Sequence, residues 1–190
     1  MVHSKTHIIA FVGMPGSGKS TAVEYLTEKG YPKVYFGGVI YDAMRDANIE
    51  ITPESQAKFR EEIRVREGKD FVVQRIITQI NDLIEAGQHR IIADGLYSWT
   101  EYKLPKHAFP GELSVVAILA PRSLRHHRLA SRHDRPFTAE EAKIRDWGEI
   151  ENLEKGGPIA MADQFIINDE SVEKLRATIN AKLSDMRFFS

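Results

Sequence analysis

One short segment constrains the fold of this chain more than any other. Residues 13–20 have the sequence GMPGSGKS and match the phosphate-binding loop pattern G-x-x-x-x-G-K-[ST] at every fixed position. An apolar run at residues 8–12 comes directly before this segment, and a helical pattern at residues 21–26 follows it. A strand, this loop and then a helix is the context in which the pattern binds nucleotide phosphates. The segment therefore predicts a nucleoside-triphosphate site at the end of a buried strand.

Each residue type in the loop has a chemical reason. Glycines let the backbone curl so that its N–H groups point at phosphate oxygens, and the N-terminus of the following helix adds partial positive charge. We expect Lys19 to reach the outer phosphates and the Ser20 hydroxyl to ligate Mg²⁺. A glycine-rich turn would explain the glycines but not the Lys-Ser pair. The expected ATP-binding residues of the loop are Gly13, Pro15, Gly16, Ser17, Gly18, Lys19, Ser20 and Thr21.

Composition narrows the class of protein. The 190 residues suit a single domain, 1–190, and carry a formal net charge of −1, so no broad cationic surface predicts a nucleic-acid or membrane partner. The absence of cysteine excludes disulfides, thiolate catalysis and cysteine–zinc sites. No apolar run is long enough to cross a bilayer and no secretory leader opens the chain, so we expect a cytoplasmic protein. Nothing in the sequence indicates an oligomeric state.

Apolar runs alternate with helical patterns along the whole chain. This alternation predicts an α/β, three-layer P-loop NTPase fold, a five-stranded parallel sheet with helices on both faces. The expected strands are residues 8–12, 33–36, 90–94, 113–120 and 164–168. Four helices have readable signals. One helix starts at Thr52-Pro53, and a second has an apolar stripe at 71–84 between Asp70 as its cap and Gly87 as its stop. A third starts with a capping box at Thr138, and the last has a packing stripe formed by Leu175, Ile179, Leu183 and Met186.

Two segments differ from core scaffold. Residues 39–68 are polar and helical, and they are the expected acceptor-binding segment. Residues 125–137 are densely basic and are the expected lid. Mobile parts of this kind let a phosphoryl-transfer enzyme exclude water from its reaction.

A second anchor follows the strand at 90–94. Asp94 ends that strand, and ligands of an open parallel sheet bind beyond the carboxyl ends of its strands. We therefore expect Asp94 on the same edge as the phosphate loop, where its carboxylate can hold Mg²⁺ directly or through water.

The basic segment offers charge for a phosphoryl group in transfer. Arg125, Arg128 and Arg132 are spaced to share one helical face, Arg135 follows in a loop and Arg145 lies on the next helix. We expect Arg132, Arg135 and Arg145 to stabilise the equatorial oxygens, and Arg125 to belong to a solvated basic face. His126, His127 and His133 lack a metal-ligand pattern and are expected at the surface or behind the site.

With these motifs the chain resembles small P-loop kinases of the adenylate kinase and dephospho-CoA kinase type. The resemblance covers nearly the whole chain and includes the phosphate loop, Asp94-Gly95, residues 128–132, Arg145 and the closing run at 162–169. It implies that Arg128 stacks on adenine, that Arg132 contacts the transferring phosphate and that Asn168 lies near the adenine pocket. It also implies an acceptor held by residues 39–68, with Arg64 and Arg75 as the best candidates in and near that segment.

The departures from that family concern the acceptor side. Residues 37–41 are GGVIY, with Gly38 where adenylate kinases have aspartate and Tyr41 where they have arginine, and Tyr97 also stands in place of an arginine. Tyrosine cannot replace a bidentate guanidinium. Gly37 and Gly38 also lack the acidic side chain of dephospho-CoA kinases, and Asp42 is the nearest carboxylate. The expected acceptor residues are Gly37, Tyr41, Arg64, Arg75 and Tyr97.

The leading hypothesis is a kinase that moves the γ-phosphate of ATP, with Mg²⁺, to a small-molecule acceptor. A nucleotide, a nucleoside or a cofactor precursor such as dephospho-CoA is the expected substrate. A nucleotide-binding regulatory ATPase or switch with a protein partner is the alternative, because the acceptor arginines of the family are missing. Nucleic-acid binding is a weaker third, because the basic run is local.

Overall fold

The computed structural model describes residues 5–68, 70–96, 98–133 and 136–189, apart from some side chains of one helix. Tyr97, Arg135 and the side chain of Arg64 lie outside the described residues. The strands are β1 (His7–Val12), β2 (Lys33–Tyr35), β3 (Arg90–Asp94), β4 (Leu113–Leu119) and β5 (Gln164–Ile167). The helices are α1 (Lys19–Glu28), α2 (Phe36–Asp46), α3 (Pro53–Glu67), α4 (Phe71–Glu85), α5 (Trp99–Ala108), α6 (Arg122–Ala130), α7 (Ala139–Glu151), α8 (Gly156–Ala160) and α9 (Val172–Asp185).

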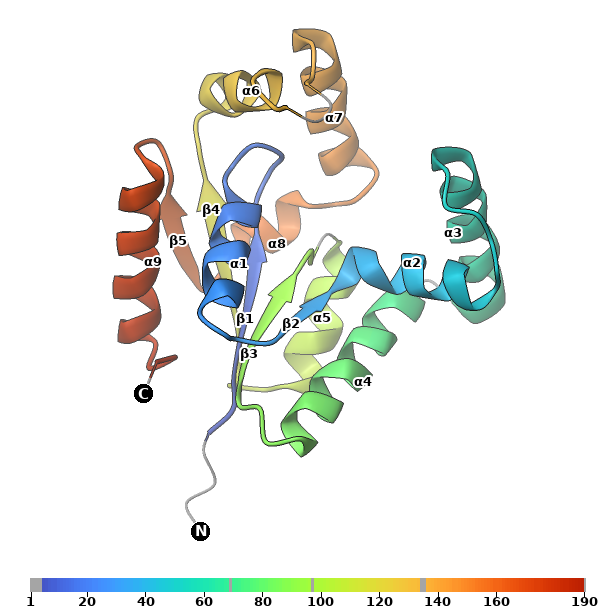
Figure 1. Ribbon diagram of the computed structural model, residues 1–190, viewed down its shortest axis with the longest axis horizontal. Coiled ribbons are helices and arrows are strands. Elements are labelled where there is room, and N and C mark those ends of the chain that lie inside the picture. Colours follow the sequence, from blue (N-terminus) through green and yellow to red (C-terminus); the bar gives the residue numbers. More distant parts are fainter. Residues whose placement is uncertain (1–4, 69, 97, 134–135, 190) are drawn as a thin grey trace.

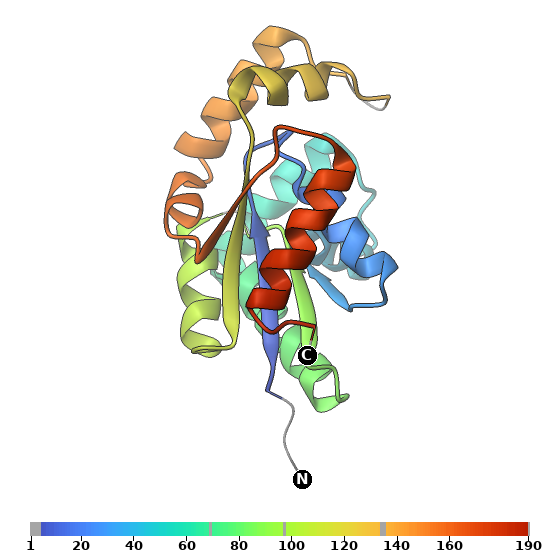
Figure 2. The ribbon, with the colours of Figure 1, turned by 90° about the vertical axis from the view of Figure 1, so that its left-hand side faces the viewer.

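The strands form one parallel sheet in the order β2-β3-β1-β4-β5 (Figure 1), which confirms the predicted fold class. Phe11 near the end of β1 is in register with Asp94 at the end of β3. The phosphate loop that follows β1 and the carboxylate of Asp94 therefore lie at the same sheet edge, as predicted. Helices α6 and α7 arch over this edge, beyond the strand ends (Figure 2).

The central strand β1 packs on both of its faces. Ile8, Ala10 and Val12 belong to a core cluster with residues of α2, α4 and α5, whereas Ile9 and Phe11 belong to a second cluster with residues of α1 and α9. A strand buried on both faces needs a continuous apolar run rather than an alternating one. This explains the sequence of β1 and gives the three layers.

Local signals set most of the helix ends. Thr138 forms the predicted capping box with Glu141 at the start of α7. A second capping box, between Ser98 and Glu101, starts α5, a helix that the sequence analysis did not predict. Asp70 occupies the N-cap position of α4, but its carboxylate accepts a hydrogen bond from the Gln74 side chain (3.1 Å) and does not cap the helix.

The segment at residues 39–68 is helical, as predicted, but it is not separate from the core. Val39, Ile40 and Met44 of α2 and Phe59 and Ile63 of α3 are all buried in the cluster that covers one face of the sheet. The polar composition hid this because each helix buries only one stripe of side chains. The expectation that this segment is not core scaffold was therefore wrong for these five residues.

The described helices are short. The longest, α3 and α4, have 15 residues each, and no helix within the described ranges is long and apolar enough to cross a membrane.

We predict that replacing Ile80 by alanine lowers the free energy of unfolding by about 2–5 kcal/mol, because it leaves a cavity in the core behind α4. Ile144→Ala is the matched control, since Ile144 is 62% exposed and its truncation should change the free energy by less than about 0.5 kcal/mol. Urea denaturation measures both. Equal losses in the two variants would contradict the assignment of Ile80 to the core.

Candidate active site

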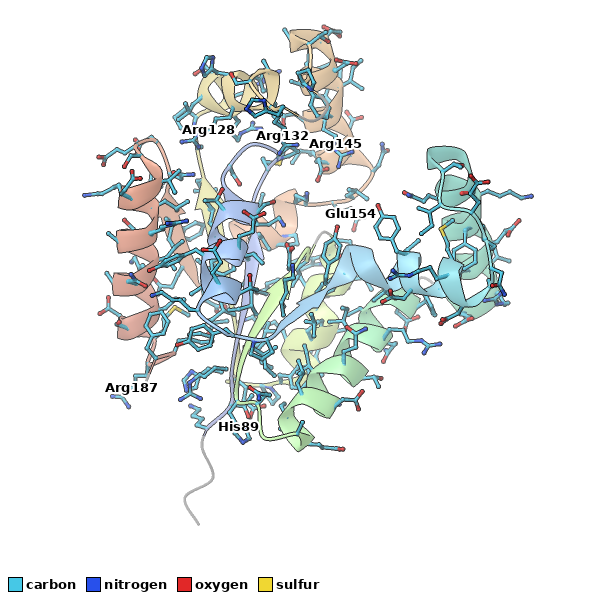
Figure 3. The ribbon with its side chains drawn as sticks, in the orientation of Figure 1. His89, Arg128, Arg132, Arg145, Glu154 and Arg187 are labelled. Atoms are coloured by element: carbon cyan, nitrogen blue, oxygen red, sulfur yellow. The ribbon has the colours of Figure 1, made fainter. Side chains whose placement is uncertain are left out.

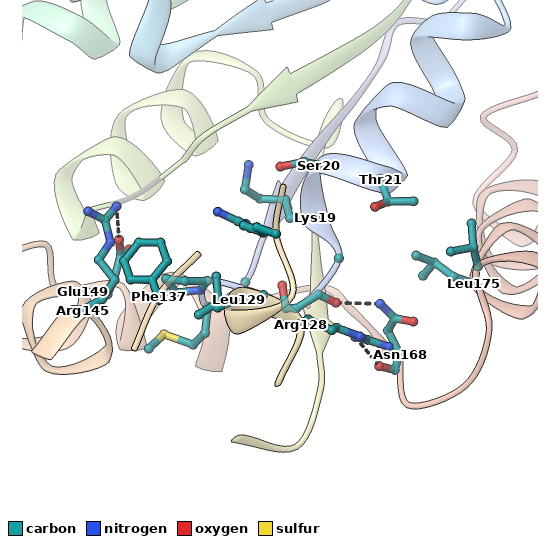
Figure 4. A pocket seen from close by; sticks show the side chains of 18 of the residues that line it. Lys19, Ser20, Thr21, Arg128, Leu129, Phe137, Arg145, Glu149, Asn168 and Leu175 are labelled. Atoms are coloured by element: carbon teal, nitrogen blue, oxygen red, sulfur yellow. Dashed lines mark hydrogen bonds and ion pairs between the residues drawn. The ribbon is translucent and has the colours of Figure 1, made fainter. Parts of the chain in front are cut away.

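A cavity of about 640 Å³ opens over the phosphate loop at the carboxyl edge of the sheet (Figure 4). All eight residues from Gly13 to Ser20, and Thr21 after them, line it. The other walls come from segments distant in sequence. They are Arg128, Leu129, Arg132, Phe137, Arg145, Glu149, Lys155, Asn168, Glu170, Val172 and Leu175.

The loop can curl because two of its glycines have a positive φ and no Cβ that would collide with the neighbouring segments. Gly16 has φ +79°, and a Cβ there would lie 2.6 Å from the carbonyl oxygen of Arg125. Gly18 has φ +101°, and a Cβ there would collide with the amide nitrogen of Asn168. That nitrogen donates a hydrogen bond to the carbonyl of Ser17 (2.7 Å). Asn168 therefore braces the loop from the end of β5.

The side chains of the loop fit an anionic ligand. The Ser17 hydroxyl is buried and has no hydrogen-bond partner among the described residues. A buried polar group without a partner is costly, and a phosphate oxygen would satisfy it. Together with the curled backbone and the start of α1, this hydroxyl makes the loop a cradle for phosphate.

Lys19, which lines this cavity, forms an ion pair with Asp94 at the end of β3. The Ser20 hydroxyl lines the same cavity. One hydroxyl and one carboxylate fit Mg²⁺, which usually takes one or two protein oxygens and completes its shell with phosphates and water. Within the described ranges no group of three or more His, Cys, Asp or Glu side chains could hold a metal by itself. These residues thus suit a metal ion that arrives with a nucleotide.

Arg125 differs from the solvated arginine that the sequence predicts. It is only 7% exposed, and its guanidinium donates to both carboxylate oxygens of Asp146 on α7 (2.7 and 2.9 Å) and to the carbonyl of Pro15 (3.0 Å). Burial raises the pKa of Asp146, but hydrogen bonds and positive charge from Arg125 and His126 outweigh it and hold that pKa below its ordinary value. Arg125 therefore ties the phosphate loop to α7.

Among the described residues, Arg128 and Arg132 of the lid and Arg145 of α7 line the cavity, and Figure 3 labels all three. Arg128 donates to the carbonyl of Asn168 (3.0 Å), and Arg132 lies exposed beyond the end of α6. Arg145 comes from α7 and donates to Glu149 (2.8 Å). Because α6 ends at Ala130, Arg132 leaves the shared helical face that the spacing predicted.

Sequence reasoning missed two buried residues of this cavity, Glu149 and Lys155, which form an ion pair. Burial, with the positive charges of Lys19 and Arg145, lowers the pKa of Lys155 to about 7, and Glu101 acts in the opposite direction. The only sequence signal for Glu149 was its spacing of four residues from Arg145. Lys155 has no motif that could have singled it out.

A second cavity of about 390 Å³ lies beside the first, between α2, α4, α5 and α7. Arg145 and Glu149 line both cavities, so the two share a wall. The remaining lining residues are Tyr35, Phe36, Gly37, Ile40, Tyr41, Ile63, Phe71, Val72, Ser98, Glu101, Asn152 and Leu153.

Only some of the expected acceptor residues line this second cavity. Gly37 and Tyr41 line it. Gly37 allows this wall to form, because a Cβ there would lie 2.5 Å from the hydroxyl of Tyr35. Arg75 lies on the exposed side of α4, with its guanidinium over the Phe71 ring (5.5 Å), and it does not line the cavity.

Comparison with known proteins places the chain among P-loop proteins. Residues 9–154 match the family described as AAA domain. The UPF0200 protein of Thermococcus gammatolerans is 36% identical over 170 residues, 88% of each chain. Shikimate kinase from Acinetobacter baumannii, in complex with shikimate, superposes with a TM-score of 0.55 at 18% identity, over 95% of this chain and 94% of that one. A gluconokinase from Sinorhizobium meliloti gives 0.55 at 15% identity over 97% of each.

These comparisons support the kinase-like fold and general nucleotide binding. The finer resemblance to adenylate kinases and dephospho-CoA kinases stays a prediction.

We predict that Gly18→Ala weakens ATP binding at least about tenfold, because the added methyl group strains the backbone and displaces Asn168. Gly87→Ala is the matched control, since Gly87 also has a positive φ (+83°) but open space around its Cβ position. The control should lose about 1–2 kcal/mol of stability and keep its ATP affinity. Titration calorimetry with ATP measures the affinities, and wild-type affinity in Gly18→Ala would contradict the cradle.

Proposed function

We propose that this chain, which belongs to the AAA domain family and to the UPF0200 proteins, is a Mg²⁺-dependent kinase that transfers the γ-phosphoryl group of ATP to the hydroxyl group of a small molecule. A nucleoside, a nucleotide or a cofactor precursor such as dephospho-CoA is the candidate acceptor.

The observation that carries this proposal is the wall that two cavities share. Arg145 and Glu149 line both the cavity over the phosphate loop and the cavity between α2 and α7. A kinase must hold the donor phosphates and the acceptor in adjoining spaces so that the phosphoryl group passes directly between them. An ATPase that only hydrolyses its nucleotide needs no second cavity beside the phosphates.

The residues of the two cavities have different roles in the transfer. Lys19, Arg132 and Arg145 neutralise the phosphates, and a Mg²⁺ held through Ser20 and Asp94 adds further positive charge when it is bound. A bond forms between the acceptor oxygen and the γ-phosphorus, while the bond from that phosphorus to the bridging oxygen breaks and leaves its electron pair on ADP. Glu149 receives the hydroxyl proton.

The second cavity suggests the chemistry of the acceptor. Its lining combines apolar side chains with the hydroxyl groups of Tyr35, Tyr41 and Ser98 and the carboxylates of Glu101 and Glu149. Among the described lining residues Arg145 is the one cation, and it is shared with the donor cavity. Such a lining suits a hydroxyl compound without a phosphate of its own, because anion clamps usually contain bidentate arginines. We therefore rank nucleosides above nucleotides as acceptors.

One observation favours a second function, a nucleotide-dependent switch with a protein partner. Ile144, Trp147 and Ile150 of α7 are exposed, on the helix that also carries Arg145 and Glu149. A nucleotide that moved Arg145 would move this apolar face as well.

We predict that one class of hydroxyl compound accelerates ADP formation from ATP and Mg²⁺ and appears as a phosphorylated product by mass spectrometry. The panel contains nucleosides, nucleotides and dephospho-CoA. Lys19→Met should lose the activity by at least about a hundredfold, because no ammonium group reaches the outer phosphates. ATP binding without any phosphorylated product, together with nucleotide-dependent capture of a protein, would favour the switch instead.

We further predict that Tyr41→Ala raises the KM for that acceptor about tenfold or more and leaves the dissociation constant of ATP unchanged. The reason is that Tyr41 lines the second cavity and not the first. Steady-state kinetics and an ATP titration measure the two constants. A loss of ATP affinity equal to the loss in KM would contradict separate donor and acceptor cavities.

A further inference from the structure

We propose that Lys155 is a catalytic residue whose ammonium group moves from Glu149 to the outermost phosphate when a nucleoside triphosphate binds. This inference rests on the proposed function for the transfer that follows, whereas the contact itself requires only nucleotide binding. Neither the phosphate-loop motif nor the basic lid segment contains this residue.

The position of Lys155 points to this role. It precedes α8 and is only 3% exposed, and its side chain lines the cavity that holds the phosphate loop. Its backbone N–H donates to the carbonyl of Glu149 (3.1 Å), which fixes the start of the side chain against α7. Lysine is rarely buried without a charged partner, and here that partner is the Glu149 carboxylate. The ammonium group is thus held against Glu149, a residue of the wall that the two cavities share.

The charges around Lys155 favour exchange of its partner. Its described charged neighbours are Lys19 of α1, Glu101 of α5, and Arg145 and Glu149 of α7. Without nucleotide, Lys155 pairs with Glu149 and Lys19 pairs with Asp94, so each of these two lysines has a carboxylate partner. A triphosphate brings several negative charges into this space and competes with both carboxylates for the lysines.

The exchange would also prepare the acceptor side. When Lys155 leaves, Glu149 keeps its hydrogen bond from Arg145 but loses one cation. A carboxylate with fewer cations around it accepts a proton more readily. Because Glu149 also lines the second cavity, nucleotide binding would make it a better acceptor for the hydroxyl proton there.

A protonation change gives this proposal a readout that needs no catalysis. The pKa of Lys155 is lowered to about 7 by burial and by neighbouring cations. A phosphate beside the ammonium group favours its charged form, so its pKa rises on binding. At about pH 8, above that pKa, part of the Lys155 population is neutral and the rest is paired with Glu149, so the protein should take up a fraction of a proton when a triphosphate binds.

The experiment is titration calorimetry of the whole chain with Mg²⁺ and either ADP or a triphosphate analogue whose β,γ-bridging oxygen is replaced by NH. Two buffers of different ionisation enthalpy, both at about pH 8, reveal the proton uptake. We expect uptake with the analogue and little with ADP. The variant Lys155→Met combined with Glu149→Gln, which avoids an unpaired buried carboxylate, should lose the uptake and bind the analogue at least about tenfold more weakly relative to ADP.

Two further variants make the test decisive. Lys155→Arg should keep the preference for the analogue but lose the proton uptake, because arginine stays charged. Lys143→Met, on the exposed surface of α7, should behave like the wild type in both respects. The proposal would be overturned if the double variant kept the wild-type preference for the analogue over ADP and the wild-type proton uptake. If the double variant does not fold, wild-type proton uptake in Lys155→Arg would overturn it instead. Failure to find any phosphate acceptor would count against the kinase function and leave these binding results to stand.

Discussion

The buried contact of Arg125 with Asp146 and with the carbonyl of Pro15 joins the parts of this molecule that must act together. A single guanidinium links the phosphate loop, α6 and α7. Arg145 precedes Asp146 on α7 and Glu149 follows it by less than one turn, so the same contact sets where these two side chains enter the cavities. Removing one partner of a buried charged pair is strongly destabilising, so this contact holds α6 and α7 against the phosphate loop at the edge of the sheet.

Three cations of the cavity over the phosphate loop are in ion pairs before any nucleotide binds. Lys19 is paired with Asp94, Lys155 with Glu149, and Arg145 with Glu149 as well. Such pairing lets several cations remain close together. The entry of an anion then redistributes existing partners, and each carboxylate that is released lies where a kinase needs one. Asp94 ends β3 at the sheet edge from which the phosphate loop leaves β1, and Glu149 lines the second cavity.

Much of this arrangement could be predicted from the sequence, and the exceptions have physical reasons. The five strands and the phosphate loop were predictable because buried parallel strands are continuous apolar runs and because the loop pattern has a fixed spacing. Arg125 was misjudged since helical spacing shows which residues share a face but not what covers that face. Lys155 and Glu149 were missed because only tertiary packing brings α7, α8 and the loop together. The core role of Phe59 and Ile63 was hidden by the charged residues around them in α3.

A crystal structure with Mg²⁺ and a non-hydrolysable ATP analogue tests whether the two cavities hold donor and acceptor side by side. We predict that the γ-phosphate lies at the wall shared by the two cavities, about 3 Å from the side-chain nitrogens of Lys19 and Lys155. We also predict that Glu149 turns the oxygen that Lys155 has left toward the second cavity. A γ-phosphate directed away from that wall, with Lys155 still paired to Glu149, would contradict both predictions.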